Sequence, residues 1–436
     1  MNSNKTQTNS TPSPLVKAGL GHLKIATAGS VDDGKSTLIG RILYDTKSLT
    51  DDKLQAIEEK SRQRGFDYLD FSLATDGLVA EREQGITIDV AHIYFSTRKK
   101  SFIIADTPGH IEYTRNMVTG ASTAQASIVL IDARNGVVEQ TYRHFFINNL
   151  LRIKDVVIAI NKMDLVDFSE EKYNIIKGEI EYLASKSEYK GQQLTFIPLS
   201  ALKGDNVVEK SDNMPWYQGE TLLHHLEKLD TEDINDASQT RFPVQTVIRP
   251  KTDKYHDYRG YAGKIYGGDF EVGDEIAILP SLTKSKIKSI NFFDKEYLKA
   301  KRGSSVTITL TDNVNVSRGD MLVKVDEQPT IAKQLEATIC WMDSAPLQAS
   351  QKYYIKHGVN DAQAKITQLN SIIKTDFSGI EENPSALALN QIGDIQLKLS
   401  KPLLFDSYKD NKSNGSFILI NPKTNNTVGV GFIKAP

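Results

Sequence analysis

The most constraining feature of this chain is a glycine-rich segment near its N-terminus, Gly29-Ser30-Val31-Asp32-Asp33-Gly34-Lys35-Ser36. It matches the pattern G-x-x-x-x-G-K-[ST], in which the glycines let the backbone curl so that successive N–H groups point at phosphate oxygens. A short apolar run at residues 23–28 precedes it, and a helical pattern begins at Ser36. This setting favours a phosphate-binding loop over a glycine-rich turn that matches by chance.

Two side chains of this loop have expected roles toward a nucleoside triphosphate. Lys35 is placed to reach the β- and γ-phosphates, and the Ser36 hydroxyl is a candidate ligand of Mg²⁺. The remaining contacts are expected from the loop backbone, up to and including Thr37. The segment therefore predicts a nucleotide site at the junction of a strand and a helix.

Apolar runs and amphipathic stretches alternate along the first half of the chain. Strands that are apolar throughout and separated by helices are typical of a parallel sheet covered on both faces. The sequence thus predicts an α/β P-loop domain, which we place at residues 21–238 after a disordered tail over residues 1–20. The expected strands are residues 23–28, 102–105, 128–131, 156–160 and 194–199, and the expected helices are residues 36–44, 113–124, 140–151 and 170–187.

A second motif, Asp106-Thr107-Pro108-Gly109-His110, follows directly after one of these strands. A carboxylate at the carboxyl end of a parallel strand lies where such sheets bind ligands, so Asp106 is a candidate Mg²⁺ ligand, directly or through water. The Gly109 N–H is placed to contact the γ-phosphate. His110 is a candidate catalytic residue that orients the attacking water, as Gln does in small GTPases.

A third motif, Asn161-Lys162-Met163-Asp164, follows the next expected strand but one. The Asp164 carboxylate can accept hydrogen bonds from N1–H and the 2-amino group of guanine, and adenine offers neither donor. The Lys162 stem can lie along the base. After a further strand, Ser200-Ala201-Leu202 supplies backbone donors to the guanine carbonyl oxygen. In this order after two phosphate motifs, these residues predict selection of GTP.

Between the first two motifs lies a charged segment that contains Thr87. A threonine on a flexible segment here can bind Mg²⁺ and the γ-phosphate, which would give an order–disorder switch. We therefore group Thr87 with His110 and Lys35 as catalytic, and with Ser36 and Asp106 as a metal ligand. Without the other motifs, a charged loop entering a strand over residues 87–96 would be the simpler interpretation.

The helical pattern largely disappears after a polar stretch at residues 231–240. Short alternating strands follow, with a second break near residues 325–331, and regularly spaced strands of this kind indicate two small antiparallel β-barrels. We place the barrels at residues 239–328 and 329–436. The single cysteine, Cys340, is expected to be a buried small hydrophobe on a strand.

The bulk composition argues against nucleic-acid and membrane partners. A formal net charge of −2 and a pI near 6.5 give no global attraction to either. The N-terminal residues lack the apolar core of a signal peptide, and no apolar run is long enough to span a bilayer. These features predict a soluble cytoplasmic protein. Lys284, Lys286 and Lys288 fit a solvent-facing strand edge, and a partner-binding face is the alternative.

With all motifs in order, the chain resembles the translation-factor family of GTPases, which joins a G domain to two β-barrels. Within that family it is most similar to the GTPase subunit, subunit 1, of the heterodimeric bacterial sulfate adenylyltransferase. Elongation factors usually have His where this chain has Ser30, and His or Ala where it has Asp33. The narrower resemblance also rests on residues 81–91, 214–219, 259–263, 317–320 and 340–342.

The resemblance implies a GTPase that couples GTP hydrolysis to synthesis of adenosine 5′-phosphosulfate and diphosphate from ATP and sulfate. It further implies GTP and Mg²⁺ as cofactors and a small catalytic subunit as partner, in a heterodimer or a larger assembly. Some relatives carry a fused adenylylsulfate kinase, and because this chain ends at Pro436 that activity is expected to be absent. Two alternatives stay open here: a translation factor of the elongation or release type, and a nucleotide-dependent binding switch with negligible turnover.

Overall fold

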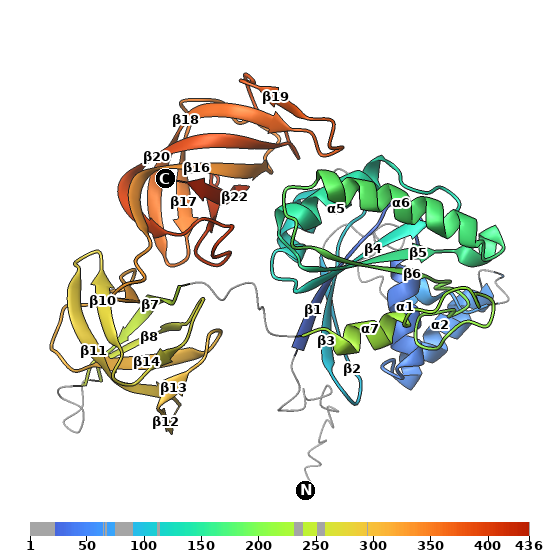
Figure 1. Ribbon diagram of the computed structural model, residues 1–436, viewed down its shortest axis with the longest axis horizontal. Helices are drawn as coiled ribbons and strands as arrows, with labels where there is room; N and C mark the ends of the chain where they lie inside the picture. Colours follow the sequence, from blue (N-terminus) through green and yellow to red (C-terminus); the bar gives the residue numbers. More distant parts are fainter. Residues whose placement is uncertain are drawn as a thin grey trace, which may run out of the picture. The chain divides into compact units, whose positions relative to one another are not determined.

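The computed structural model describes residues 22–63, 65, 68–74, 90–110, 114–230, 239–250, 258–293 and 295–435. The chain divides into two compact units, Met1–Glu232 and Asp233–Pro436. The first contains a six-stranded sheet with helices, and the second contains two seven-stranded sheets and a two-stranded one (Figure 1). The predicted tail and Thr87 lie outside the described residues, and the three predicted domain boundaries stay predictions.

The sheet of the first unit has the strand order β2-β3-β1-β4-β5-β6. All neighbouring strands are parallel except β2, which is antiparallel to β3. Because five strands point the same way, their carboxyl ends meet at one edge of the sheet, where such folds bind ligands. The strands are β1 (His22–Ala28), β2 (Ala91–Ser96), β3 (Ser101–Asp106), β4 (Ala126–Asp132), β5 (Asp155–Asn161) and β6 (Gln193–Pro198).

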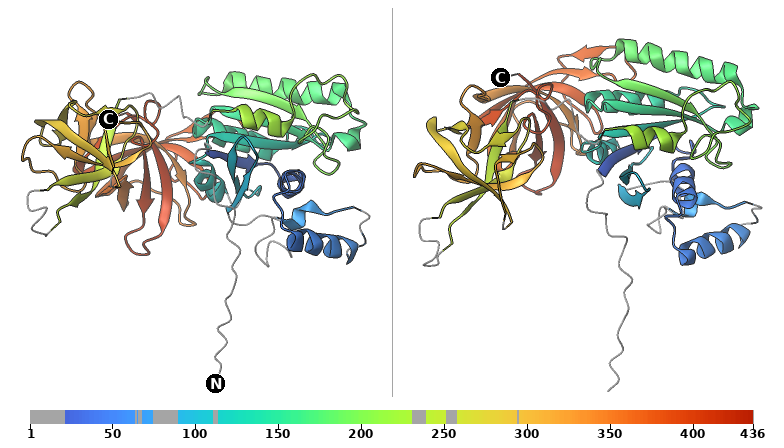
Figure 2. Two further views of the ribbon diagram at one scale, coloured as in Figure 1. Left: turned by 90° about the horizontal axis from the view of Figure 1, so that it is seen from below. Right: turned by 60° about the horizontal axis from the view of Figure 1, so that its bottom comes forward.

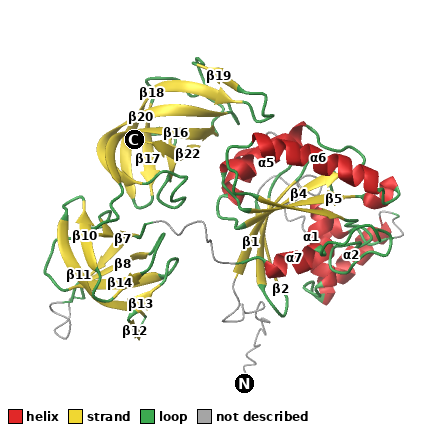
Figure 3. Ribbon diagram, viewed as in Figure 1, coloured by secondary structure: helices red, strands yellow, loops and turns green. Residues whose placement is uncertain are grey.

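Helices cover both faces of this sheet, as Figures 1, 2 and 3 show. Leu38 of α1 and Leu222 of α7 share one buried cluster with Ile25 of β1, whereas α5 and α6 lie over the opposite face. None of the described helices is long and apolar enough to cross a membrane. The helices are α1 (Lys35–Asp45), α2 (Asp51–Gln63), α4 (Thr114–Ala121), α5 (Glu139–Leu150), α6 (Glu170–Lys186) and α7 (Leu222–Lys228), with short 3-10 turns η1 (Phe71–Ala74) and η3 (Met163–Val166).

The five predicted strands are all parallel, and β2, an edge strand outside that set, is antiparallel to β3. Only residues 97–100 separate β2 from β3, and the Thr97 N–H donates to the Lys100 carbonyl (2.9 Å) in the turn between them. So short a connection permits only an antiparallel pair, since parallel strands need a long crossover. The four predicted helices are present within a few residues, whereas α2 and α7 were not expected from the sequence.

Six strands of the second unit close into a barrel, which we call the first barrel. They follow the order β10-β15-β7-β8-β14-β11, and β10 also pairs with β11 to complete the ring. β12 lies outside the ring, paired with β11. The strands are β7 (Arg241–Ile248), β8 (Gly260–Lys264), β10 (Glu275–Leu279), β11 (Thr283–Phe292), β12 (Lys295–Tyr297), β14 (Ser305–Leu310) and β15 (Met321–Lys324); β9 (Phe270–Glu271) and β13 (Lys299–Ala300) form the two-stranded sheet.

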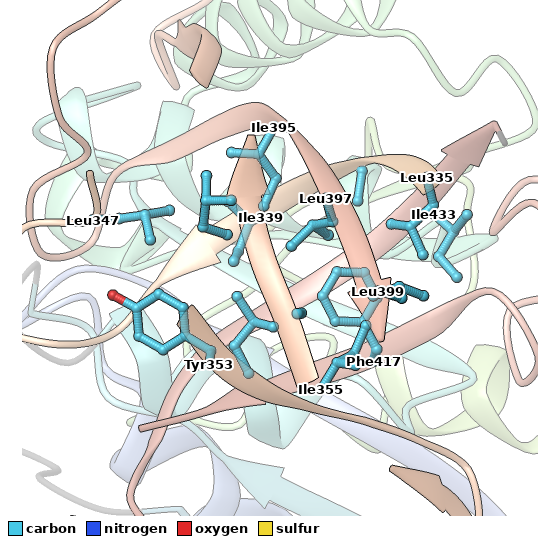
Figure 4. Packing of buried hydrophobic residues seen from close by; sticks show 14 of the residues in the cluster. Leu335, Ile339, Leu347, Tyr353, Ile355, Ile395, Leu397, Leu399, Phe417 and Ile433 are labelled. Atoms are coloured by element: carbon cyan, nitrogen blue, oxygen red, sulfur yellow. The ribbon is translucent and has the colours of Figure 1, made fainter. Parts of the chain in front are cut away.

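A second ring, the second barrel, follows the order β17-β21-β22-β16-β20-β18 and closes through β17 and β18. Its interior is filled by aliphatic and aromatic side chains from all six strands. Figure 4 shows some of them, among them Ile339, Ile355 and Phe417. Cys340 is fully buried on β16, as predicted. The strands are β16 (Thr330–Trp341), β17 (Lys352–His357), β18 (Asn360–Ile373), β20 (Ile392–Phe405), β21 (Ser416–Ile420) and β22 (Thr427–Ala435), with β19 (Ile380–Glu382) beside β18.

A buried ion pair joins the two barrels. Arg241, the fully buried first residue of β7, donates from Nη2 to Asp406 Oδ1 (2.8 Å) and from Nε to Asp406 Oδ2 (3.0 Å). Asp406 directly follows β20, so the pair connects one barrel to the other. A bidentate pair of this kind is both strong and directional. Beside it, an apolar cluster spans the same junction: Ala277, Leu279, Met321 and Val323 of the first barrel with Leu404 of the second.

Candidate nucleotide-binding site

Three of the predicted loops are held together by one side chain, that of Asn161. This residue ends β5 and is 2% exposed. Its Nδ2 donates to the Asp33 carbonyl (2.8 Å), and its Oδ1 accepts from the Ala201 N–H (2.9 Å). The third motif is therefore fixed to the P-loop on one side and to the loop after β6 on the other, at the edge where the parallel strands end.

The P-loop is a tight turn that requires its second glycine. Gly34 has a left-handed backbone (φ +92°), and a Cβ there would lie 2.5 Å from Asn161 Nδ2. Across the turn, the Ser30 N–H donates to Asp33 Oδ2 (2.5 Å). Burial raises the pKa of the Asp33 carboxyl above its ordinary value, and the Ser30 hydrogen bond and the Lys35 charge oppose it only in part. The two residues that set this loop apart from elongation factors thus contact each other.

Lys35 is the first residue of α1, and its ammonium group is buried inside the loop. Nζ donates to the Gly29 carbonyl (2.8 Å). Burial lowers the pKa of this ammonium, whereas the carboxylates of Asp106, Asp33 and Asp32 favour its charged form. A desolvated cation beside a curl of backbone N–H groups is suited to bind phosphate oxygens, since few water molecules compete for it.

The second motif lies directly against the first. A Cβ at Gly109 would lie 2.2 Å from the Gly29 carbonyl oxygen and 2.7 Å from Lys35 Nζ, so only glycine fits there. The backbone of this residue is therefore next to the group expected to face the γ-phosphate. His110 follows and is solvent-exposed, while Thr107 and Pro108 are buried.

Asp106 is 2% exposed at the end of β3. Its Oδ1 accepts from Thr27 Oγ1 (3.2 Å), and the Thr107 hydroxyl donates to the Thr27 carbonyl (2.5 Å), so the ends of β1 and β3 hold the carboxylate in place. No described group of three His, Cys, Asp or Glu residues could hold a metal by itself. One carboxylate with the Ser36 hydroxyl fits Mg²⁺, which completes its shell with phosphate oxygens and water.

The base side of the site contains an ion-pair network that the sequence did not predict. Lys162 Nζ lies 3.0 Å from Asp132 Oδ2 and also donates to the Asp32 carbonyl in the P-loop. Burial opposes ionisation of Asp132, but hydrogen bonds from Arg134 and Lys162 outweigh it and hold the pKa at about 2. The end of the Lys162 side chain is thereby fixed between β4 and the P-loop, and Asp164, two residues further on, is half-buried.

The loop at Ser200-Ala201-Leu202 is supported from α1. Arg41 Nη1 donates to the Leu202 carbonyl (3.2 Å), and Arg41 Nε pairs with Asp45 (2.8 Å). The Ser200 hydroxyl accepts the Lys203 N–H (3.2 Å). These contacts turn the backbone of the loop while leaving the Ala201 N–H bonded to Asn161.

Asp132 and His144 are the two site residues that sequence reasoning missed. Asp132 ends the apolar strand β4, so the rule that selected Asp106 could have found it. His144 is 2% exposed on α5 and carries no such signal. Burial, together with the Lys35 and Arg143 charges, lowers the pKa of His144 to about 3. A hydrogen bond with the Gly109 backbone acts in the opposite direction but is the smaller effect. His144 is therefore neutral at pH 7 and lies behind the second motif.

The family model of the elongation factor Tu GTP binding domain matches residues 20–243, and that of the GTP-eEF1A C-terminal domain-like family matches residues 334–434. Sulfate adenylyltransferase subunit 1 of Bacteroides fragilis is 49% identical over 414 residues, which are 94% of this chain and 85% of that protein. The chain belongs to the family of sulfate adenylyltransferase subunit 1. The bifunctional enzyme CysN/CysC of Mycobacterium tuberculosis is 48% identical over 94% of this chain and 67% of its own length.

Membership in the sulfate adenylyltransferase subunit 1 family decides against one alternative that the sequence left open, the translation factor. The chain is a GTPase subunit of this family and not an elongation or release factor, as the Ser30 and Asp33 positions predicted. The elongation-factor fold with two β domains is likewise confirmed. Among solved structures, sup35 complexed with GDP matches 98% of this chain at 21% identity, with a TM-score of 0.43.

Proposed function

We propose that this chain hydrolyses GTP to drive synthesis of adenosine 5′-phosphosulfate and diphosphate from ATP and sulfate on a small partner subunit. The two form a heterodimer or a larger assembly in the cytoplasm, where both nucleotides are available. The observation that carries the proposal is the joining of three nucleotide loops through Asn161, in a chain 49% identical to a sulfate adenylyltransferase subunit 1.

GTP is assigned to the loops described above. Asp164 selects guanine, the Lys162 stem lies along the base, and the loop at Ser200-Ala201-Leu202, whose Ala201 N–H is bonded to Asn161, supplies the guanine carbonyl oxygen with the Leu202 N–H. The α-, β- and γ-phosphates lie over the P-loop backbone from Gly29 to Thr37, close to Lys35. The buried Asp106 carboxylate, the Ser36 hydroxyl and Thr87 would hold Mg²⁺, which neutralises phosphate charge when bound.

The chain's own residues contribute mainly by positioning and by electrostatics. Lys35 and the P-loop N–H groups hold the phosphates, and the fixed N–H of Gly109 favours the extra negative charge that reaches the γ-phosphoryl oxygens. His110 holds the attacking water in line with the scissile bond. Water and GTP give GDP and phosphate, and no covalent intermediate on the protein is needed.

Coupling requires that GTP hydrolysis and phosphosulfate synthesis change each other's equilibria. The phosphoric–sulfuric anhydride bond is strongly uphill to form from ATP and sulfate, so its product accumulates only when an exergonic reaction is linked to it. A G domain provides that link if the partner's catalytic steps and the segments at Thr87 and His110 change each other's equilibria.

The coupling is tested by following GDP and adenosine 5′-phosphosulfate together in a mixture of this chain, its small subunit, ATP, sulfate and GTP. We expect slow GTP hydrolysis and no phosphosulfate from the chain alone. In the full mixture, GTP turnover should rise and product should exceed the level that ATP alone supports. Thr87→Ala should uncouple the two reactions, so that the GTP still consumed no longer adds to the yield. A yield that GTP leaves unchanged would reject the proposal.

Replacing His110 by alanine should lower kcat by about 10²–10³-fold and leave GTP affinity near that of the parent, because the contact to water is made mainly in the transition state. Single-turnover hydrolysis with the partner present, beside a fluorescent-GTP titration, separates the two quantities. His224→Ala, an exposed histidine on α7, is the matched control. Full turnover in the His110 variant would remove this residue from the mechanism, and negligible turnover in the parent would indicate a binding switch.

A further inference from the structure

Four large apolar side chains are exposed on the β11–β12 hairpin of the first barrel. Phe292, Phe293, Tyr297 and Leu298, which we call the hairpin patch, are 46%, 87%, 42% and 82% exposed. The rings of Phe292 and Phe293 contact each other at 4.7 Å between centroids. Other exposed large apolar residues in the described parts of the chain are scattered, and no two of them are adjacent in sequence. Isolated exposed residues are normal, whereas several exposed apolar side chains on one hairpin indicate an interaction site.

The barrel does not need this patch for its own folding. The ring closes through the pairing of β10 with β11, and β12 is added outside it (Figure 1). Ile290 of β11, by contrast, points into the barrel core and is fully buried. The hairpin residues are therefore apolar at positions where folding of the described structure would accept polar ones.

Phe293 is unfavourable in its backbone conformation as well as in its exposure. Its φ is +51°, in the left-handed region where Asn or Gly is favoured over a bulky side chain. Leu282, just before β11, is also exposed and left-handed, so what distinguishes Phe293 is that other exposed apolar residues lie on the same hairpin. At the turn of a hairpin, such a conformation directs the aromatic ring outward, away from the barrel.

Lysine side chains lie around the hairpin patch, and their positive charge indicates the chemical class of its partner. Lys284, Lys286 and Lys288 lie along the outer face of β11, and Lys295 is at the tip. Lys286 pairs with Glu275, but Lys288 and Lys295 form no ion pair with any described residue. Glu296 lies within the patch and is exposed, which disfavours a polyphosphate ligand such as nucleic acid. An apolar centre with a charged rim is the composition of a protein–protein interface.

We propose that the hairpin patch anchors this chain to its small partner subunit, with Phe293 and Leu298 inserted into an apolar hollow that has an acidic rim. The proposal rests on the proposed function, since it requires that partner. Four side chains are fewer than a stable interface needs, so the patch is its energetic centre and other surfaces complete the contact.

The test measures the dissociation constant between the full chain and the purified small subunit at low and at moderate salt. The double variant Phe293→Ser/Leu298→Ser should bind at least about 30-fold more weakly, the loss expected of a hot spot. Lys288→Glu/Lys295→Glu should slow association mainly at low salt. The control is Leu282→Ser, at the other end of β11, because Leu282 is also exposed (55%) and left-handed (φ +60°).

GTP titration and thermal unfolding of each variant alone establish that it is folded. If the parent binds and the double variant binds equally well, the hairpin proposal fails and the proposed function stands. If the parent does not bind the small subunit at all, both fail. Two further results would also overturn the proposal: a loss of self-association by the double variant, measured by sedimentation, or a loss of binding to a single-stranded oligonucleotide probe that the parent retains.

Discussion

Replacing Asp164 by asparagine is expected to weaken GTP binding by about 2–4 kcal/mol and to improve binding of xanthosine triphosphate. The amide loses one of the two acceptors that face guanine N1–H and the 2-amino group, and the remaining donor of the ligand stays unpaired in the site. Xanthine has a carbonyl where guanine has the amino group, so the new Nδ2–H can donate to it. Competition between the two triphosphates for a fluorescent analogue measures both changes.

The surroundings of Asp164 make this substitution a test of the base pocket alone. Asn161 and Lys162 hold the motif to the P-loop through their bonds to the Asp33 and Asp32 carbonyls, which the change leaves intact. Asp167→Asn is the matched control, since that residue is exposed and follows η3 directly. A variant at Asp164 that still prefers GTP over the xanthine nucleotide would show that another residue selects the base.

Replacing Lys35 by alanine is expected to abolish tight GTP binding. Hydrogen bonds to charged groups contribute about 1.5–3 kcal/mol each, so losing contacts to two phosphates should lower the affinity by about 3–6 kcal/mol. The burial of this ammonium among Asp106, Asp33 and Asp32 adds to the effect, because the carboxylates then repel the phosphates without a compensating cation. A titration with a fluorescent GTP analogue gives the magnitude.

The control for this variant is Lys24→Ala, an exposed lysine on β1. Thermal unfolding without nucleotide establishes that both variants are folded, and with excess GTP only the control should gain stability, since ligand binding to the native state raises the unfolding temperature. Equal stabilisation of the two variants by GTP would place the phosphates elsewhere.

Much of the first unit could be predicted because most of its strands are continuous apolar runs in the sequence. β4 and β5 lie in the centre of the sheet and are buried along nearly their whole length, so they appear as continuous apolar runs. β2 is an edge strand that is only partly buried, and its antiparallel direction depends on the short turn before β3. α2 was missed because it is largely polar, with only Ile57 and Ser61 buried.

The motifs of the site could be predicted because each directly follows an apolar strand, and the ends of parallel strands meet at one edge of the sheet. The contacts that hold the motifs together could not be predicted, because they join residues that are distant in sequence. Asn161 was assigned to nucleotide binding, but its bond to the Asp33 carbonyl spans 128 positions. His144 contacts the Gly109 loop from α5 and has no neighbouring motif that would single it out.

The buried pair of Arg241 and Asp406 has a consequence for how sequences of this family can recombine. Exchanging only one barrel with a relative that lacks either residue would leave the other residue of the pair without its partner. An uncompensated charge at a buried pair destabilises a protein by about 3–5 kcal/mol, a large part of the stability of a domain. Recombination events that are retained in evolution should therefore fall before residue 239 and transfer both barrels at once. The two barrels would then share one ancestor even where the G domain comes from a different one.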